Sequence, residues 1–332
     1  MSPADSGHGA PSGAGRIVPL LDGQARVEFE RHLTSGPAEA WSLLTVPERL
    51  ARWMAPVEFD GADYRIVFGD AEDDVVTGKI LECEEYSRLV VTWEVPGAGP
   101  SRVEATLEPR DAVTVLHLVH SGLAAPHARG LAAGWQAYLD QLEAHVDGRE
   151  LAEDWQQRWT RAVPEYQRQL PPGLAAVQVG GSRGSLRFER RLEADLPDAW
   201  SVVTEPERIA RWFAPVTVDG TGVGARWRTF WDDGAEYAEG VVQRCEPLRL
   251  LEVTWAATDD ADSAESLLRV TLSSSEDGVL LVLEHAGLGS ADLVQYGAGW
   301  QSFLEQIESR SGRDWSDAYL ELKPIYEQMV GR

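Results

Sequence analysis

The sequence predicts an α+β protein made of two tandem domains that share one fold. Three observations lead to this prediction. Residues 29–57 return in similar form as residues 188–216, and further matched residues follow both segments in the same order. Within each repeat, short stretches alternate apolar and polar residues, as antiparallel strands do. Each repeat then closes on a longer stretch with apolar residues three and four positions apart, which is typical of an amphipathic helix that covers a sheet.

The repeat also sets the expected domain boundaries. The repeated unit is roughly 150 residues long, an ordinary size for a domain, and with 43% hydrophobic residues each half can bury its own core. We expect a disordered tail over residues 1–24, a first domain over 25–170 and a second domain over 185–332. Residues 171–184 between them are rich in Gly and Pro and are expected to form a linker.

Charge and composition exclude several classes of partner. Lys and Arg number 30 against 54 Asp and Glu, so the net charge of −24 repels nucleic-acid phosphates and anionic membranes. No apolar run approaches membrane-spanning length, and residues 1–15 lack the charged and apolar parts of a signal peptide. We therefore expect a cytoplasmic protein that binds neither nucleic acid nor membrane. Cys83 and Cys245 occupy equivalent places in two expected strands, which favours two separate buried thiols over one disulfide.

Each domain is expected to begin with a strand followed by two short helices. In the first domain, residues 27–33 alternate as a strand with one apolar face does. Pro37 and Pro197 suit the first turn of a helix. Thr45 and Thr204, each followed three residues later by Glu, have the spacing of a capping box for the second helix. An Ala-Pro pair then ends this second helix in both domains.

A meander of short strands and a long helix complete each domain. From the second helix to about residue 120, and again to about residue 285, apolar alternations are broken by Gly, Asp and Pro, which predicts an antiparallel meander. The long helix that follows contains Gly134 in the first domain and Gly299 in the second, where glycine costs about 1 kcal/mol relative to alanine. We expect a strand to pack closely against these glycines, with a ligand as the alternative. The tail segment of the first domain is expected to be helical up to Pro164.

Several longer motifs occur in the repeats in the same order. They include Thr-x-Pro-Glu-Arg-x-Ala-Arg-Trp-x-Ala-Pro from Thr45 and Thr204, Arg-Leu-Val-Val-Thr-Trp ending at Trp93, and Gly-Trp-x-x-x-Leu from Gly134 and Gly299. Together they resemble the AHSA1-type branch, named for the C-terminal domain of the Hsp90 ATPase activator, of the START/Bet v 1-like (SRPBCC) superfamily. The resemblance implies two tandem helix-grip domains, each an antiparallel curved sheet wrapped around a long C-terminal helix, with two short helices after the first strand and an apolar cavity inside. The activator's additional N-terminal domain has no counterpart in this sequence, so stimulation of Hsp90 is not carried over.

The cavity implied by the resemblance directs the choice of site residues. The aromatic rings could instead fill the core, and the two histidines among the candidates could be bonded to neighbouring groups at their strand ends. No nucleophile, phosphate-loop or metal-binding motif occurs, so we assign no catalytic residue, cofactor or metal. The expected ligand-binding residues are Trp53, Tyr64, Phe68, Trp93, His120 and Trp135 in the first domain, and Trp212, Trp227, Trp231, Trp255, His285 and Trp300 in the second.

These residues favour a binding protein for small hydrophobic molecules. One alternative is an enzyme of the polyketide aromatase/cyclase kind, in which His120 or His285 acts as acid or base. Another is a chaperone-associated or other protein-interaction module, in which the aromatic tails at Trp155 and Trp315 dock on a partner, or on the sister domain in a pseudo-dimer within one chain.

The two cavities are expected to differ. In the second domain Trp227 and Trp231 take the places of Tyr64 and Phe68, and Phe303 replaces a tyrosine of the first long helix. Larger rings with fewer hydroxyl groups predict a narrower and more apolar second cavity.

Overall fold

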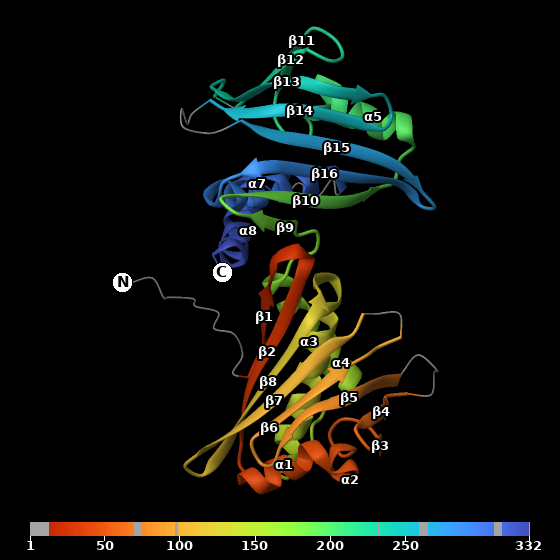
Figure 1. Cartoon of the computed structure of the whole chain (residues 1–332), viewed down its shortest axis with the longest axis vertical. Helices are drawn as coiled ribbons and strands as arrows, with labels where there is room; N and C mark the ends of the chain where they lie inside the picture. The colour runs from red at the N-terminus through yellow and green to blue at the C-terminus, as the bar shows by residue number, and fades with distance from the viewer. Residues whose placement is uncertain are drawn as a thin grey trace. The chain divides into compact units, whose positions relative to one another are not determined.

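The structure, a computed structural model, describes residues 13–69, 75–96, 99–231, 233–258, 265–308 and 314–331. The chain divides into two compact units (Figure 1). Gln24–Pro171 and the described residues up to Leu20 form the first, and Pro172–Arg332 with the short segment Leu21–Gly23 forms the second. Each unit has one antiparallel sheet of eight strands followed by helices, which confirms the α+β class and the tandem helix-grip arrangement.

In the first domain two strands come before the two short helices, and six more strands lead to the long helix and a tail helix. Its strand order across the sheet is β1-β2-β8-β7-β6-β5-β4-β3. A short 3-10 helix, η1 (Leu21–Gly23), separates its first two strands. The elements are β1 (Arg16–Pro19), β2 (Gln24–Leu33), α1 (Pro37–Thr45), α2 (Pro47–Leu50), β3 (Val57–Asp60), β4 (Asp63–Val67), β5 (Val75–Glu84), β6 (Arg88–Trp93), β7 (Ser101–Arg110), β8 (Val113–Ala124), α3 (Ala125–Val146) and α4 (Trp155–Gln169).

The second domain repeats this order with the same sheet topology. Its strand order is β11-β12-β13-β14-β15-β16-β10-β9, so β9 and β10 correspond to β1 and β2. The elements are β9 (Ala176–Gly180), β10 (Arg183–Leu192), α5 (Leu196–Thr204), α6 (Pro206–Ile209), β11 (Val216–Asp219), β12 (Arg226–Phe230), β13 (Glu236–Glu246), β14 (Leu250–Ala257), β15 (Ser266–Ser275), β16 (Gly278–Leu288), α7 (Ser290–Glu308) and α8 (Trp315–Val330).

The long helix of each domain lies across one face of its own sheet (Figure 1). In α3 the buried stripe combines small and large residues, among them Ala128, Ala132, Trp135, Leu139 and Leu142. The alanines let the helix backbone approach the sheet, while the larger side chains fill the space between the two layers.

A row of cross-strand neighbours runs over the inner face of each sheet. Because alternate residues of a strand face the same side, every member of a row faces the helix side. In the first domain the row passes through Phe29, Leu118, Ala105, Leu89 and Cys83. The matching row of the second domain passes through Phe188, Leu283, Val270, Leu251 and Cys245.

The cysteines at the ends of these rows are less buried than expected. Both thiols are free, as predicted, but Cys83 is exposed and Cys245 is half-buried. The prediction of buried thiols was therefore wrong: the rows end on β5 and β13, and both cysteines keep accessible surface there.

The expected tail and linker each contain an ordered strand. Of the predicted disordered residues 1–24, Arg16–Pro19 forms β1 and pairs with β2, whereas residues 1–12 lie outside the described part. Within the predicted linker 171–184, Ala176–Gly180 forms β9 and pairs with β10. Both corrections have one cause: each short segment extends the sheet by backbone hydrogen bonds and buries apolar side chains, as Val18 and Val177 do.

The expected capping boxes do not form. The Thr45 hydroxyl donates to the carbonyl of Trp41 at 2.9 Å, and Thr204 donates to Trp200 at 2.7 Å. Each threonine is the last residue of the preceding helix, so the carbonyl four residues earlier lies within its reach. The following helices α2 and α6 begin without a side-chain cap.

The tail helices continue through their prolines. α4 extends to Gln169 although Pro164 lies inside it, and α8 contains Pro324 in the same way. A proline removes one backbone hydrogen bond from a helix. The turn after the proline is held by a buried tyrosine, Tyr166 in α4 and Tyr326 in α8, so the helix does not stop at the proline as predicted.

Each buried tyrosine joins three parts of its domain. The Tyr166 hydroxyl accepts from the backbone N–H of Gly15, next to β1, and donates to Gln136 of α3, both at 2.9 Å. In the second domain the Tyr326 hydroxyl accepts from Ala175 and donates to Gln301 of α7 at the same distances. The edge strand, the long helix and the tail helix are thereby connected at one point.

Candidate functional site

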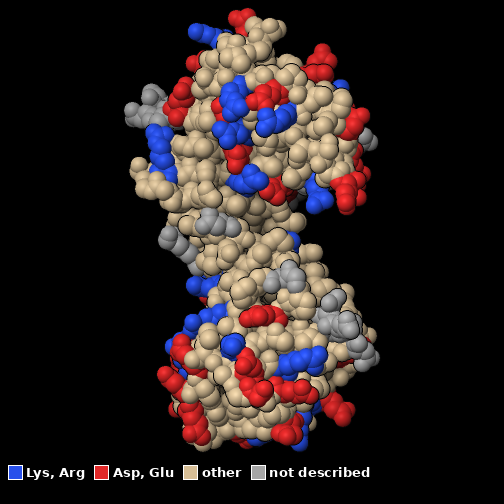
Figure 2. Space-filling view, turned by 45° about the vertical axis from the view of Figure 1, so that its right-hand side comes forward, with Lys and Arg blue, Asp and Glu red and all other residues tan. Residues whose placement is uncertain are grey.

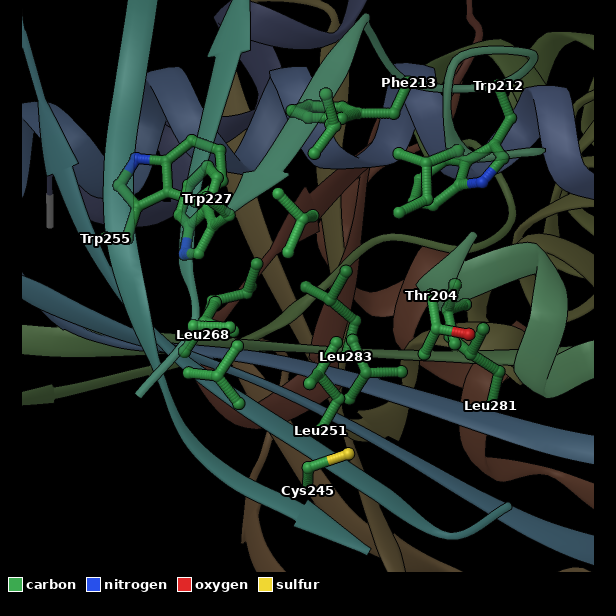
Figure 3. A pocket seen from close by; sticks show the side chains of 18 of the residues that line it. Thr204, Trp212, Phe213, Trp227, Cys245, Leu251, Trp255, Leu268, Leu281 and Leu283 are labelled. Carbon is green, nitrogen blue, oxygen red and sulfur yellow. The ribbon is translucent and has the colours of Figure 1, made fainter. Parts of the chain in front are cut away.

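Each domain contains an apolar cavity between its sheet and its helices, which we call the inner cavity. Its volume is about 290 Å³ in the first domain and about 210 Å³ in the second. The cross-strand rows described above supply the floor, with Leu118, Ala105, Leu89 and Cys83 in the first domain. In the second domain Leu251 and Leu283 lie between two groups of aromatic rings, with Cys245 below them (Figure 3).

Four of the six predicted site residues of each domain line the inner cavity. In the first domain these are Trp53, Tyr64, Trp93 and Trp135, and in the second they are Trp212, Trp227, Trp255 and Trp300. The remaining predicted residues of each domain, Phe68 and His120 or Trp231 and His285, do not line it.

Hydrogen bonds fix several of the aromatic walls. The Trp53 indole N–H donates to the carbonyl of Leu43 in α1 at 2.9 Å, and Trp212 donates to Val202 in α5 at 3.0 Å. The Tyr64 hydroxyl donates to the carbonyl of Thr92 at 2.5 Å. These hydrogen bonds satisfy the indole N–H groups of Trp53 and Trp212 and the hydroxyl of Tyr64, so the three side chains present mainly apolar surface to the cavity.

Both histidines form the same buried hydrogen-bond chain. The indole N–H of Trp135 donates to Nδ1 of His120 at 2.9 Å, and Nε2 of His120 lies 2.8 Å from the Ser101 hydroxyl. Indole nitrogen only donates, so Nδ1 must accept, and in the neutral ring Nε2 carries the proton and donates to serine. The serine hydroxyl in turn donates to the carbonyl of Trp93 at 2.8 Å.

The second domain repeats this chain. Trp300 donates to Nδ1 of His285 at 3.0 Å, and Nε2 lies 2.9 Å from the Ser266 hydroxyl, which donates to the carbonyl of Trp255. Burial lowers the pKa of His120 and of His285 to about 3. Both imidazoles are therefore neutral near neutral pH, with both ring nitrogens engaged.

A second hollow, which we call the outer hollow, lies beside the tail helix of each domain. Its volume is about 470 Å³ in the first domain and about 120 Å³ in the second. Phe68 and Trp231, predicted for the inner cavity, line the outer hollows instead. Phe68 follows the last residue of β4, and the register of β12 shifts between Thr229 and Phe230, so the strand alternation no longer holds there.

The tail aromatics pack on the long helix of their own domain. The Trp159 indole N–H donates to the carbonyl of Gly130 at 3.1 Å, and a methyl group at Gly134 would lie 3.6 Å from the ring of Trp155. Gly134 thus faces the tail helix, and a methyl group at Gly299 would meet no atom within 4 Å. No strand packs closely against either glycine, so that prediction was wrong. Of the two glycines in α7, Gly297 is the one with a close neighbour: a methyl group there would lie 2.4 Å from the Tyr326 ring.

The smaller volume of the second inner cavity agrees with the expected narrowing. Of the three larger rings expected to cause it, only one lines this cavity. Trp227 does line the cavity, whereas Trp231 and Phe303 line the outer hollow. Phe213 was not among the predicted site residues; it stands where the first domain has Met54 and stacks on Trp300 at 5.2 Å between ring centroids. Figure 3 shows Phe213 over one end of the cavity.

Charged side chains gather on the outer surfaces rather than in the inner cavities. Figure 2 shows basic and acidic groups interspersed over both domains. On the first sheet a guanidinium nitrogen of Arg102 forms ion pairs with carboxylate oxygens of Glu82 at 3.4 Å and Glu104 at 3.5 Å. On the second sheet a guanidinium nitrogen of Arg269 lies 2.7 Å from a carboxylate oxygen of Glu252. In the ranges that the structure describes, no three His, Cys, Asp or Glu side chains are placed to hold a metal ion. Within the same ranges, no helix has the length and apolar character needed to cross a membrane.

Comparisons with solved structures found several similar chains. The crystal structure of CalU16 from Micromonospora echinospora is 27% identical, covers 47% of this chain and 95% of its own, and has a TM-score of 0.38. The solution structure of the BPP1335 protein from Bordetella parapertussis is 26% identical, with coverages of 50% and 94% and a TM-score of 0.38. DynU16, a protein of the dynemicin biosynthetic locus, is 18% identical, with coverages of 92% and 96% and a TM-score of 0.36.

A family model matches both repeats. The model described as Activator of Hsp90 ATPase homolog 1-like protein matches residues 35–147 and 193–312. A search of curated proteins found no match. Since the family model matches more than half of the chain, once in each repeat, the chain belongs to the Activator of Hsp90 ATPase homolog 1-like family.

Proposed function

We propose that this protein binds small hydrophobic molecules in its two inner cavities. One observation carries the proposal: both domains keep an apolar cavity at the same place, although many of the lining residues differ between them. Packed interiors rarely leave such space empty, and ligand pockets are mostly apolar with few polar groups. Volumes of about 210 and 290 Å³ lie below the range of about 300–1,000 Å³ for pockets of drug-sized ligands, which favours smaller molecules.

The geometry supports binding better than acid–base catalysis. The two histidines that an aromatase/cyclase-like reaction would use are held neutral by burial, which lowers the pKa of each to about 3. Both of their ring nitrogens are bonded to protein groups, and neither side chain lines the cavity. The wall tryptophans can supply contact area to a ligand, which is a binding role.

Filling one cavity at a time tests the proposal. Ala105 lines the first cavity and Val270 the second, and both occupy the same place in their sheets. A105F and V270F should each remove one binding site for a neutral apolar fluorescent probe such as N-phenyl-1-naphthylamine, with a loss of affinity there of about tenfold or more, equivalent to about 1.4 kcal/mol. Fluorescence titration of the full-length protein measures both the number of sites and their affinities.

The next residue on each strand provides the matched control. Thr106 and Thr271 are only partly buried, and strand alternation turns them to the other side of the sheet. T106F and T271F should therefore leave probe binding unchanged. Absence of probe binding by the native protein, or equal losses in the filled and control variants, would contradict the proposal.

A further inference from the structure

The indole nitrogen of Trp93 is a buried donor without an acceptor. Trp93 is 7% exposed, and its Nε1 atom is buried with no hydrogen-bond partner in the part of the chain that the structure describes. A buried donor left unpaired is unfavourable, so such an atom in a native protein needs an explanation. Trp93 lines both the inner cavity and the outer hollow of the first domain.

The second domain shows what the first one lacks. There the equivalent Trp255 donates its indole N–H to the Tyr296 hydroxyl at 2.9 Å. Tyr296 lies on α7, four residues before Trp300, and at the same place on α3 the first domain has Leu131. Tyr296 lines the outer hollow of its domain, and Leu131 lines the outer hollow of the first. By this equivalence the free N–H of Trp93 is directed toward Leu131, at the wall of the outer hollow.

The outer hollow of the first domain is also larger than that of the second. The first outer hollow measures about 470 Å³, against about 120 Å³ in the second domain, where Tyr296 and Tyr237 are among the lining residues. In the second domain the Tyr296 hydroxyl supplies an acceptor for the indole N–H, and Leu131 at the same place in the first domain supplies none. The first outer hollow has the volume for a ligand, and two of its lining residues, Trp93 and Trp155, have buried indole donors without a partner in the described part of the chain.

Aromatic rings form the walls of the first outer hollow. The Phe68 ring lies 6.2 Å from Trp93 and 5.6 Å from Tyr138, and Tyr138 lies 5.4 Å from Trp155, all as centroid distances. Burial raises the pKa of the Tyr138 hydroxyl to about 12, so this phenol stays neutral near neutral pH. Walls of this kind favour a flat, uncharged aromatic ligand.

We propose that the outer hollow of the first domain is a second ligand site, which binds a flat neutral aromatic molecule whose carbonyl oxygen accepts the indole N–H of Trp93. The site goes beyond the function proposed above, because it lies in only one of the two domains and does not require the inner cavities to be occupied. In the second domain the Tyr296 hydroxyl fills the role of the ligand oxygen.

A matched pair of probes tests the required oxygen. Fluorenone and fluorene have the same three-ring frame and differ only in the carbonyl group. Full-length protein should bind fluorenone about fivefold to tenfold more tightly than fluorene at this site, the range that one hydrogen bond provides. On addition of fluorenone the indole N–H resonance of Trp93, assigned by its absence in W93F, should move downfield in a nitrogen-correlated NMR spectrum, and fluorene should not cause that shift.

Two variants locate the site. L131Y introduces the tyrosine of the second domain, whose hydroxyl can accept the Trp93 N–H as Tyr296 does for Trp255, so it should abolish the preference for fluorenone while Trp93 is kept. W93F should abolish the preference for fluorenone over fluorene. The A105F variant, which fills the inner cavity, should leave the preference intact, so this result separates the outer site from the function proposed above.

Three results would overturn the inference. Equal affinities for the two probes in native protein would mean that solvent satisfies the Trp93 donor. An unchanged preference for fluorenone in L131Y would place the ligand oxygen elsewhere. Loss of the preference in A105F, with the Trp93 resonance unmoved in native protein, would place it in the inner cavity.

Discussion

Two histidines that would suit acid–base chemistry are structural parts of the core. His120 and His285 each accept a hydrogen bond from a tryptophan of the long helix and face a serine of the neighbouring strand. Removal from water penalises the charged ring, and this burial lowers the pKa of both to about 3. The chain thus uses neutral imidazole as a hydrogen-bond connector between sheet and helix.

This state of the histidines predicts a loss of stability in mild acid. The folded-state pKa of His285 lies below the ordinary value of 6.5, so the unfolded chain binds more protons between the two values. Stability is therefore kept above pH 6.5 and falls as the pH drops toward 3. Between pH 7 and pH 5 each histidine should reduce the free energy of unfolding by about 2 kcal/mol. Urea unfolding at both pH values measures this change.

Substitution identifies the contribution of the histidine. H285Q cannot take up a proton, so its free energy of unfolding should depend less on pH by the same amount, although it is less stable at pH 7. H127Q replaces an exposed histidine and should keep the pH dependence of the native protein. If H285Q and native protein lost stability equally between pH 7 and pH 5, the histidine would not be the titrating group.

At the scale of elements, the alternation and helical spacing of apolar residues predicted the strands and helices that bury one continuous face. The long helices, the meander and the cavity-facing residues Trp93 and Trp255 follow from these periods. The edge strands β1 and β9 were missed because four or five residues next to Gly and Pro carry too little periodicity to distinguish a strand from a loop. Trp231 was misplaced because it follows the end of β12, where a register shift that a sequence does not display interrupts the alternation.

The connections made by the tail helix were also hidden from the sequence. The spacing of Pro164 and Tyr166 recurs in the second repeat, but it does not reveal that the hydroxyl reaches Gln136 and the backbone next to β1. Contacts between segments about 150 residues apart have no local signal, since they depend on the folded arrangement. The repetition of the tail was the only indication that it has a shared role.

The buried tyrosines should stabilise their domains. Y166F and Y326F each remove a buried hydroxyl that bonds to a backbone N–H and to a glutamine of the long helix. Y326F leaves the N–H of Ala175 without this acceptor, whereas in Y166F the N–H of Gly15 keeps a 3.3 Å bond to Gln136. Each variant should lower the free energy of unfolding by about 1–3 kcal/mol. Urea unfolding of full-length protein checks this, with Y86F at an exposed tyrosine as the control. A loss of less than about 0.5 kcal/mol in both variants, the range of surface changes, would contradict it.

At the scale of the whole molecule, the chain is two copies of one domain with separate cores. Leu118 and Trp135 belong to the first copy, while Leu283 and Trp300 hold the same places in the second. The observed division at Pro171 and Pro172 puts β9 in the second domain rather than in a linker. A domain of about 160 residues can bury enough apolar surface to fold alone.

We expect the fragment 172–332 to fold cooperatively by itself. The shorter fragment 184–332 lacks β9, whose Val177 is fully buried and whose backbone pairs with β10, so it should unfold at a lower urea concentration. Circular dichroism during urea titration compares the two. An unfolded 172–332 fragment, or equal stability of both fragments, would contradict a domain boundary between Pro171 and Pro172.

The cysteines at the ends of the two cross-strand rows also make the cavities chemically addressable. The sequence contains two cysteines, and each lines the inner cavity of one domain. Replacing either by serine leaves a single thiol, to which an environment-sensitive dye can be attached beside a chosen cavity. Ligand entry could then be followed separately in each half of the same molecule.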